Sequence, residues 1–446
     1  MTNKREGMVT TTRQKINRRD FLKLGGAGLA GAALLGVAGC GGGGAGSGNL
    51  IFSMGPDDPN KTVTRLIEKF NQQNKGEFQV TYRLMPADTG QYFDKLRTEF
   101  QAGGGDIDVM GADVIWPIQF AAQGWLKDLS EDFPESEQQK FLPAPLAAST
   151  YEGGVYAVPW YEDAGLLYYR KDLLEQSGFS APPKTWDELK EMAQTVTEQT
   201  GTPNGFVFQG ANYEGGVCNA LEYIRTHGGD VLENVTSGKV IIDSPEAAAG
   251  LETYHSMIAD GVAPQAVLNY TETESVPVFG NGEAVFLREW PGTYGDIAGG
   301  QEYNLKIEKV GVAPIPVAPG HQSSSTLGGW TMAINAQTDM PDEAWAFAQF
   351  MTSEESLKWR AIEGGYIPAR KPLLDDPEVI EATPIIGLAK EILLDNATSR
   401  PVTQFYGDMS LEMQEQFNAA LKGEVSPQQA VETLQKSLSS IMQQAD

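Results

Sequence analysis

The sequence has few of the side chains that build disulfide frameworks or metal sites. Its 446 residues include two Cys and three His. Two Cys cannot form a disulfide framework, and three scattered His argue against a site made of several His ligands. We therefore expect no metal site, and no motif in the chain calls for a cofactor.

Basic residues are also scarce, with 33 Lys and Arg against 59 Asp and Glu, for a formal net charge of −26. Proteins that bind nucleic acids need a basic surface to displace counterions, so this charge argues against a nucleic-acid partner. The enzyme signatures H-E-x-x-H, G-x-S-x-G and the Walker A lysine loop are missing as well. An apolar fraction of 41% still predicts ordinary buried cores, and the length predicts two or three domains.

Residues 1–39 predict an export signal. A basic segment precedes a short run of small and apolar residues at 24–38, which suits a signal peptide and is too short to span a membrane. The sequence NRRDFLK at 17–23 resembles the twin-arginine export signal. The sequence VAGC at 37–40 resembles the lipobox of bacterial lipoproteins. The order of these features predicts an exported lipoprotein.

The residues after the signal predict a membrane anchor. Cys40 would carry the lipid, and the Gly-rich residues 40–48 would tether the protein to the extracytoplasmic face of the bacterial cell membrane. After Cys40, the only thiol is Cys218, which we expect to be a buried small hydrophobe.

From Asn49 onward the chain reads as alternating strands and helices. We predict strands at 50–54, 78–82 and 107–115, a helix with the apolar face Val63, Leu66, Ile67 and Phe70, and helices that begin with Thr185, Ser244-Pro245 and Ser426-Pro427. Such alternation predicts α/β sheets covered by helices, and the length predicts two such lobes.

Aromatic and charged residues occur together where strands should end or loops begin. These constellations are Asp113–Trp116, Trp160–Asp163, Tyr213–Gly215, Arg288–Trp290, Gly328–Trp330 and Arg400–Pro401. Ligands of open α/β sheets bind beyond the carboxyl ends of the strands. Flat aromatic faces can cover the C–H faces of a pyranose, and a hydrogen bond to a charged group is worth roughly 1.5–3 kcal/mol. The mixture therefore favours a neutral sugar as ligand.

Other interpretations of the same residues stay open. Any single Trp or Tyr could be a core residue, and Asp113, Asp163 or Arg400 could serve in caps, ion pairs or loops. Glu162 beside Asp163 suggests a glycosidase, but neighbours on a strand point to opposite faces, so the signal for paired acids is weak. A secreted glycoside hydrolase using two cleft carboxylates is the alternative function, and a peptide- or metal-binding relative is a third.

Four segments carry a family resemblance. They are GLLYYRKDLL at 165–174, YEGGVC at 213–218, LGGW at 327–330 and RPV at 400–402. They resemble the extracellular solute-binding proteins of sugar ABC importers, of the maltose-binding-protein-like family, and within it the trehalose/maltose-binding branch. The resemblance extends over nearly all of the mature chain.

This resemblance implies an α/β fold of the periplasmic-binding-protein type, with two lobes, a hinge that the chain crosses several times and a ligand cleft between the lobes. The first lobe would comprise 49–162 and 326–366, and the second 163–325 and 367–446. The implied function is capture of an α-linked disaccharide and its delivery to the permease subunits by lobe closure. The protein would be a lipid-anchored monomer that carries out no chemistry.

The resemblance also implies the sugar contacts. Asp113 would accept hydrogen bonds from sugar hydroxyls, Tyr161 and Asp163 would lie at the hinge side of the cleft, and Trp290 and Trp330 would stack on the sugar rings. The backbone of Gly329 would approach the ligand closely, and Arg400 would donate from the second lobe. The set of implied contacts is thus Asp113, Tyr161, Asp163, Trp290, Gly329, Trp330 and Arg400.

Two positions depart from the family pattern. Members place a Glu after the first strand and an Arg near the second, whereas this chain has GPDDPNK at 55–61 and DTGQY at 88–92. Asp57, Asp58 and Gln91 are candidate replacements for those contacts. Glu214, in the YEGGVC segment, is a further candidate.

Overall fold

The computed structural model describes residues 48–104, 106–236, 238–299 and 303–443. The predicted export signal, Cys40 and the tether up to residue 47 lie outside the described residues. Within the described ranges, no helix is both long enough and apolar enough to cross a membrane.

The first lobe is built on a seven-stranded sheet in the order β12-β6-β11-β3-β1-β2, with β13 also paired to β11. Its strands are β1 (Gly48–Met54), β2 (Phe78–Leu84), β3 (Val109–Asp113), β6 (Ala157–Ala164), β11 (Ser325–Ile334), β12 (Ile367–Pro368) and β13 (Ala397–Thr398). The predicted strands at 50–54, 78–82 and 107–115 are confirmed as β1, β2 and β3. β3 is buried at every position, which fits a strand covered by helices on both faces of the sheet.

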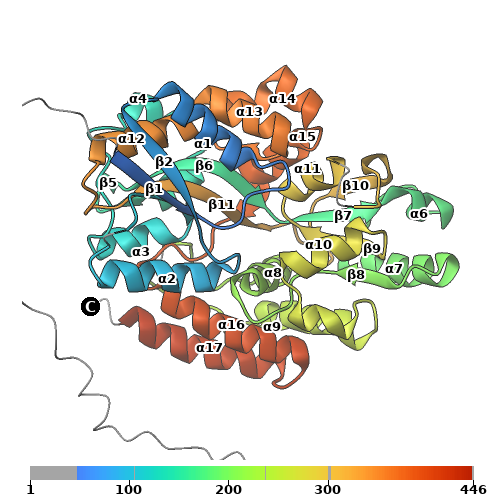
Figure 1. The fold of residues 1–446 in the computed structure, drawn as a ribbon. Coiled ribbons are helices and arrows are strands. Elements are labelled where there is room, and N and C mark those ends of the chain that lie inside the picture. The colour runs from blue at the N-terminus through green and yellow to red at the C-terminus, as the bar shows by residue number, and fades with distance from the viewer. Residues whose placement is uncertain (1–47, 105, 237, 300–302, 444–446) are drawn as a thin grey trace, which may run out of the picture. The chain divides into compact units, whose positions relative to one another are not determined.

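Helices cover both faces of this sheet, with α1, α12 and α13 above it and α2 and α3 below it in Figure 1. The helices are α1 (Thr62–Gln73), α2 (Thr89–Gln101), α3 (Trp116–Ala122), α4 (Glu135–Gln138), α5 (Pro143–Ala148), α12 (Pro341–Met351) and α13 (Glu354–Gly364), and a small hairpin joins β4 (Thr150–Tyr151) to β5 (Gly154–Val155). The apolar face predicted for α1 is buried, so the periodicity of its sequence places that helix against the sheet.

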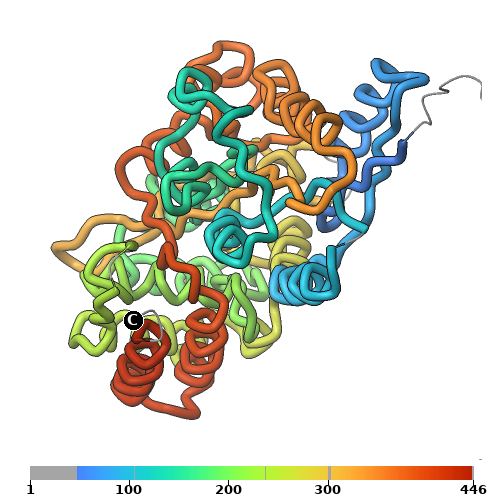
Figure 2. Tube along the Cα trace, turned by 90° about the vertical axis from the view of Figure 1, so that its left-hand side faces the viewer, coloured from blue at the N-terminus to red at the C-terminus, as the bar shows by residue number. Residues whose placement is uncertain are grey.

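The second lobe is built on a four-stranded sheet in the order β10-β7-β9-β8. Its strands are β7 (Leu166–Arg170), β8 (Asn204–Val207), β9 (Ala284–Glu289) and β10 (Val310–Ala313). Its longer helices are α7 (Trp186–Thr200), α8 (Glu214–Arg225), α9 (Pro245–Ala259), α10 (Glu272–Gly280), α16 (Tyr406–Lys422) and α17 (Pro427–Met442). The shorter helices of this lobe are α6 (Lys171–Gln176), η2 (Gln265–Asn269), α11 (Gly292–Ala298) and η3 (Ile307–Lys309). Four further short helices contact α13, β12 or β11 of the first lobe or one another: η4 (Lys371–Asp375), α14 (Pro377–Ala382), α15 (Ile386–Glu391) and the π-helix η5 (Ile392–Asn396). Figure 2 shows α16 and α17, in red, packed side by side.

The predicted helix starts of this lobe are confirmed. The side chain of Thr185 accepts a hydrogen bond from the backbone N–H of Glu188 and forms a reciprocal capping box with it. Ser244 caps α9 ahead of Pro245, and Ser426 forms a second capping box at the start of α17. Each cap pairs a backbone N–H that the helix itself leaves free, which explains why these starts are readable from local sequence.

The first connection between the two sheets is a single residue. β6 ends at Ala164 in the first sheet and β7 begins at Leu166 in the second, so Gly165 alone links them. A Cβ at Gly165 would collide with the side chains of Glu222 and Arg288, which explains why glycine occupies this link. A second crossing runs from the end of β10 to the start of β11.

Candidate functional site

A cavity of about 640 Å³ lies between the two lobes and takes residues from both sheets. Ten of the eleven sugar-binding candidates named from the sequence line it: Asp57, Asp58, Asp113, Tyr161, Asp163, Glu214, Trp290, Gly329, Trp330 and Arg400. The eleventh, Gln91, lines a second cavity instead. The size of the main cavity is that of a typical small-molecule site.

Strand register places three of these residues in one row across the first sheet. Trp330 on β11 pairs with Asp113 on β3 at one side and with Tyr161 on β6 at the other. Asp163 follows Tyr161 by two residues and so shares its face of the strand. The row and Asp163 together therefore present an indole, a phenol and two carboxylates to the same cavity.

Gly329 has to be glycine for this row to form. Its φ of +114° lies in the region that disfavours other residues, and a Cβ there would come 2.7 Å from the backbone oxygen of Tyr161. The backbone of β11 therefore runs close to β6 immediately before Trp330. A regular β-strand would not bring the two strands together in this way, and the register shifts between Trp330 and Thr331.

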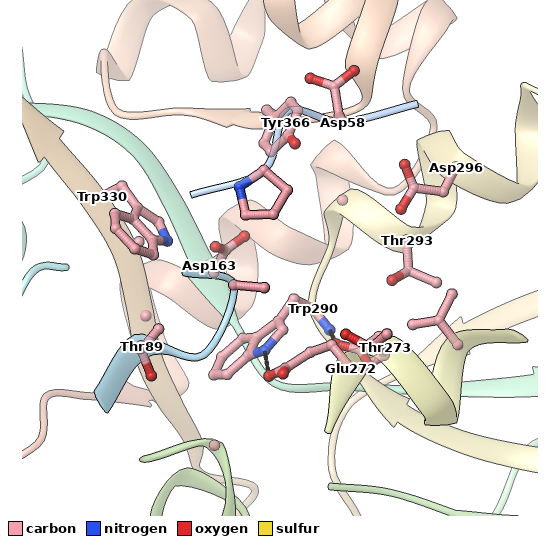
Figure 3. A pocket seen from close by; sticks show the side chains of 18 of the residues that line it. Asp58, Thr89, Asp163, Glu272, Thr273, Trp290, Thr293, Asp296, Trp330 and Tyr366 are labelled. Carbon is pink, nitrogen blue, oxygen red and sulfur yellow. Dashed lines mark hydrogen bonds between the residues drawn. The ribbon is translucent and has the colours of Figure 1, made fainter. Parts of the chain in front are cut away.

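Two indole rings form opposite walls around a carboxylate. Trp330 is backed by Tyr92, whose ring centroid lies 6.1 Å away at an interplanar angle of 20°. The indole N–H of Trp290 donates to Glu272 over 3.0 Å, and the guanidinium carbon of Arg288 lies 4.0 Å from the centre of its ring. Figure 3 shows Asp163 between the two indoles. Both rings are thus fixed in orientation before any ligand arrives.

The Asp163 carboxylate has free capacity to accept hydrogen bonds in the cavity. Its side chain accepts no hydrogen bond from any residue in the described ranges. Burial raises the pKa of Asp163 to about 7, and the positive charge of Arg360 opposes that rise. A ligand hydroxyl could therefore supply the hydrogen bond that the protein does not.

Arg400 and Asp113 are engaged with each other. The guanidinium of Arg400 is 2% exposed and donates to Asp113 over 2.7 Å and to Glu214 over 2.8 Å. Glu214 also accepts from the hydroxyls of Tyr406 and Ser410. Burial raises the pKa of Asp113, while the charge of Arg400 counteracts it. Asp113, Glu214 and Arg400, which the sequence analysis expected to contact a ligand, therefore use much of their hydrogen-bonding capacity within the protein.

Asp57 and Asp58 serve the start of α1. The backbone N–H groups of Val63 and Thr64 donate to Asp57 over 3.0 and 2.8 Å, and that of Thr62 donates to Asp58 over 3.3 Å. The carboxylates line the cavity but are occupied by the helix N-terminus, whose partial positive charge stabilises them there.

Several lining residues were missed by the sequence analysis, among them Glu272, Thr293 and Tyr366. Tyr366 follows two glycines, as Trp330 does, and this repeated pattern is the one signal that could have found it. Behind the cavity wall, Arg360 is 2% exposed, and its guanidinium carbon lies 3.8 Å from the ring centre of Tyr366 and 4.2 Å from that of Tyr161. The arginine fixes both rings and places a positive charge behind the cavity wall.

The neighbouring carboxylates of β6 point to opposite faces, as predicted. Glu162 is 1% exposed, and neither of its oxygens has a hydrogen-bond partner in the part of the chain that the structure describes. Burial raises the pKa of Glu162 well above the usual range, and the charge of Asp163 adds to the rise. Glu162 therefore does not join Asp163 in the cavity.

Within the described residues, no group of three or more His, Cys, Asp or Glu side chains is placed to hold a metal ion.

Comparisons with known proteins agree with this geometry. A model of bacterial extracellular solute-binding proteins matches residues 56–358, and a model of twin-arginine translocation signal sequences matches residues 15–36, which confirms the predicted export signal. A probable ABC transporter-binding protein of Deinococcus radiodurans is 36% identical over 80% of this chain and 85% of its own length.

Solved structures agree as well. The maltose-bound MalE3 of T. maritima is 39% identical with a TM-score of 0.82, covering 87% of this chain and 98% of the other. A solute-binding protein of Thermotoga lettingae with bound α-D-tagatose is 25% identical with a TM-score of 0.76, covering 89% and 100%. The predicted two-lobed periplasmic-binding-protein fold is thus confirmed. With its family model matched over most of the mature chain, this protein belongs to the bacterial extracellular solute-binding proteins.

Proposed function

We propose that this protein captures an α-linked disaccharide of the trehalose or maltose type outside the cytoplasm and delivers it to the permease subunits of an ABC importer. It would carry out no chemistry on the sugar. The observation that carries the proposal is the interlobe cavity, in which Trp330 and Trp290 form walls on either side of the free carboxylate of Asp163. MalE3 has maltose bound, which supports a sugar as the ligand. The Deinococcus relative is named a probable ABC transporter-binding protein, which supports an ABC permease as the partner.

The cavity chemistry suits an uncharged sugar better than an anion. The two indoles offer apolar faces for the C–H sides of two pyranose rings, and Asp163 offers a strong acceptor for a hydroxyl. Arg400 is matched by Asp113 and Glu214, and the lining otherwise carries carboxylates rather than cations. An anionic ligand would therefore be repelled, whereas a polyhydroxyl ligand would find both apolar faces and acceptors.

Lobe closure would convert binding into a signal for the permease. The lobes are linked through Gly165 and through the segment before β11, so a ligand that touches both lobes favours a closed arrangement by its differential contacts. We propose that the monomeric protein hands over its sugar in this closed state. We also propose that a lipid on Cys40 and the tether 40–48 hold it at the membrane.

The test is calorimetric titration with trehalose, maltose and sucrose, run beside an assay for released glucose. We expect binding heat without glucose release. Glucose release would instead select a glycoside hydrolase, and absence of binding heat for all three sugars would contradict the disaccharide assignment. Small-angle scattering of the same samples should show a smaller radius of gyration with saturating sugar, and an unchanged radius with measured binding would contradict lobe closure.

A further inference from the structure

A buried ion pair lies inside the second lobe, between β9 and α8. The guanidinium of Arg288 on β9 donates to the carboxylate of Glu222 on α8 through two nitrogens, over 2.8 and 2.5 Å. Each side chain is only 2% exposed, and neither residue lines the main cavity. Two parallel hydrogen bonds fix the orientation of the guanidinium and the carboxylate as well as their distance. The pair therefore holds β9 and α8 in one relative position.

This ion pair touches both connections between the lobes. The backbone N–H of Thr326, the second residue of β11, donates to Glu222 over 3.1 Å. At the other connection, Gly165 packs so closely on Glu222 and Arg288 that a Cβ there would collide with both side chains. The hydroxyl of Ser325 donates to the backbone oxygen of Gly165 over 2.7 Å. The two connections are thus bound to the ion pair and to each other.

The same guanidinium reaches the wall of the main cavity. The guanidinium carbon of Arg288 lies 4.0 Å from the centre of the Trp290 ring, and Trp290 forms one wall of that cavity (Figure 3). A Cβ at Gly328 of β11 would come 3.1 Å from the edge of the same ring. A contiguous set of contacts therefore leads from the indole through Arg288 and Glu222 to both connections between the lobes.

We propose that Arg288 and Glu222 are positioning residues that transmit sugar stacking on Trp290 to the two connections, and so set how far the lobes close. This rests on the proposed function, in which a sugar stacks on Trp290 and favours a closed arrangement. The stacked sugar fixes the indole against the guanidinium, and the carboxylate of Glu222 passes that restraint to Thr326 and Gly165. The sugar then stabilises one arrangement of the connections through groups that it does not touch.

The experiment measures affinity by calorimetry and closure by small-angle scattering, with whichever of trehalose, maltose and sucrose binds the wild type. Arg288→Lys keeps the buried charge but removes the two parallel hydrogen bonds and the flat group beneath the indole. We expect it to weaken binding by about threefold to tenfold, the scale of one hydrogen bond. We also expect it to reduce the decrease in radius of gyration at saturating sugar.

The matched control is Arg170→Lys in the same lobe. Arg170, at the end of β7, donates to both oxygens of Asp172 over 2.8 and 2.7 Å, so the variant loses the same bidentate geometry away from the cavity and the connections. It should bind and contract like the wild type.

The two indole walls provide a second comparison. Of the two, Trp290 rests on Arg288, whereas Trp330 is backed by Tyr92 of the first lobe. Trp290→Ala and Trp330→Ala should both lower affinity, but the contraction at saturating sugar should be reduced in Trp290→Ala and keep its wild-type size in Trp330→Ala. The double variant Trp290→Ala/Arg288→Lys should contract no less than the weaker of its single variants, because both changes interrupt the same set of contacts.

The outcomes separate this proposal from the one on which it rests. If Arg288→Lys contracts like the wild type, whatever its affinity, the ion pair does not transmit closure and the proposed function stands. An equal loss of contraction in Arg170→Lys or Trp330→Ala would also overturn the proposal. If the wild type binds none of the three sugars, or binds without contracting, the proposed function itself fails and this proposal with it. Should Arg288→Lys not reach the wild-type melting temperature, the comparison of Trp290→Ala with Trp330→Ala decides.

Discussion

Arg400 donates a hydrogen bond of 2.7 Å to Asp113, a residue 287 positions earlier in the chain and at the end of β3. The same guanidinium reaches Glu214 at the start of α8, so one buried cation holds two buried carboxylates. Both carboxylates line the interlobe cavity. The ion pair thus forms part of the wall of the cavity and determines how much of Asp113 is left to accept from a ligand.

Replacing Arg400 should destabilise the protein strongly. Arg400→Met leaves Asp113 and Glu214 buried without their cation, which we expect to lower the free energy of unfolding by about 3–5 kcal/mol. Arg97→Met is the control, because the Arg97–Asp94 pair is exposed and should contribute less than about 1 kcal/mol. Urea unfolding measures both. Equal losses in the two variants would contradict a buried, stabilising ion pair.

Removing a stacking indole should weaken every sugar that binds. Trp330→Ala and Trp290→Ala each remove an apolar face that any pyranose can use, so we expect a loss of about 2- to 12-fold for each disaccharide tested. Trp345→Ala on α12 removes an indole outside the cavity and should leave affinity unchanged. Calorimetry with several sugars is the measurement. A loss confined to one sugar would contradict the stacking role.

Asp163 should select among sugars. Asp163→Asn keeps the shape but turns a carboxylate that only accepts into a group that both donates and accepts. Sugars with a hydroxyl that donates to this position should lose about 1.5–3 kcal/mol of binding free energy, and others should lose little. The unliganded variant must melt at the wild-type temperature. Wild-type affinity for every sugar in a correctly folded variant would show that this carboxylate does not contact the ligand.

The affinity for sugars that donate a hydroxyl hydrogen bond to Asp163 should depend on pH. The pKa of Asp163 is raised to about 7, so lowering the pH from 8 to 6 protonates the carboxyl and weakens it as an acceptor. We therefore expect affinity to fall as the pH decreases through about 7, and to stay flat over this range in Asp163→Asn. Titration calorimetry at several pH values tests this. A flat wild-type profile would contradict the assignment.

Arg360 should set the midpoint of this pH profile. Its charge lowers the pKa of Asp163 against the effect of burial, so Arg360→Met should move the fall in affinity to higher pH. Arg360→Lys keeps the charge and should leave the midpoint near 7. A midpoint that is the same in Arg360→Met as in the wild type would mean that the arginine only packs against Tyr161 and Tyr366.

Membrane attachment should depend on Cys40. One acyl chain gives marginal membrane binding and two give stable attachment, so Cys40→Ser should move the exported protein from the membrane fraction to the soluble fraction. Immunoblots of both fractions measure the shift. Cys218→Ser is the control, since Cys218 is buried and should not carry a lipid. A Cys40→Ser protein that stays with the membrane after export would contradict the anchor.

Local sequence predicts the features that depend on neighbours in the chain. The capping box of Thr185 and Glu188 spans one helical turn, and the apolar face of α1 follows from a spacing of three and four residues. The opposite orientation of Glu162 and Asp163 follows from the two-residue period of a strand. The export signal is likewise a short linear pattern. All of these could be predicted because the physical cause lies within a few residues.

Only the tertiary structure decided how Arg400 is used, because the guanidinium pairs with Asp113 and Glu214, which lie 287 and 186 positions earlier in the chain. Asp57 and Asp58, which the sequence offers as ligand contacts, hold the start of α1 through neighbours four to seven residues away, so their role has a local cause.

The tertiary structure likewise decided where Gln91 and Arg360 lie. Gln91 lies in the second cavity because α2 faces α16, a helix more than 300 residues later in the chain. Arg360 lies behind the rings of Tyr161 and Tyr366 because α13 packs against β12. Residue type and spacing determined which groups could bind a sugar, but a buried charge pairs with whatever long-range folding brings within hydrogen-bond reach, and that choice is made in three dimensions.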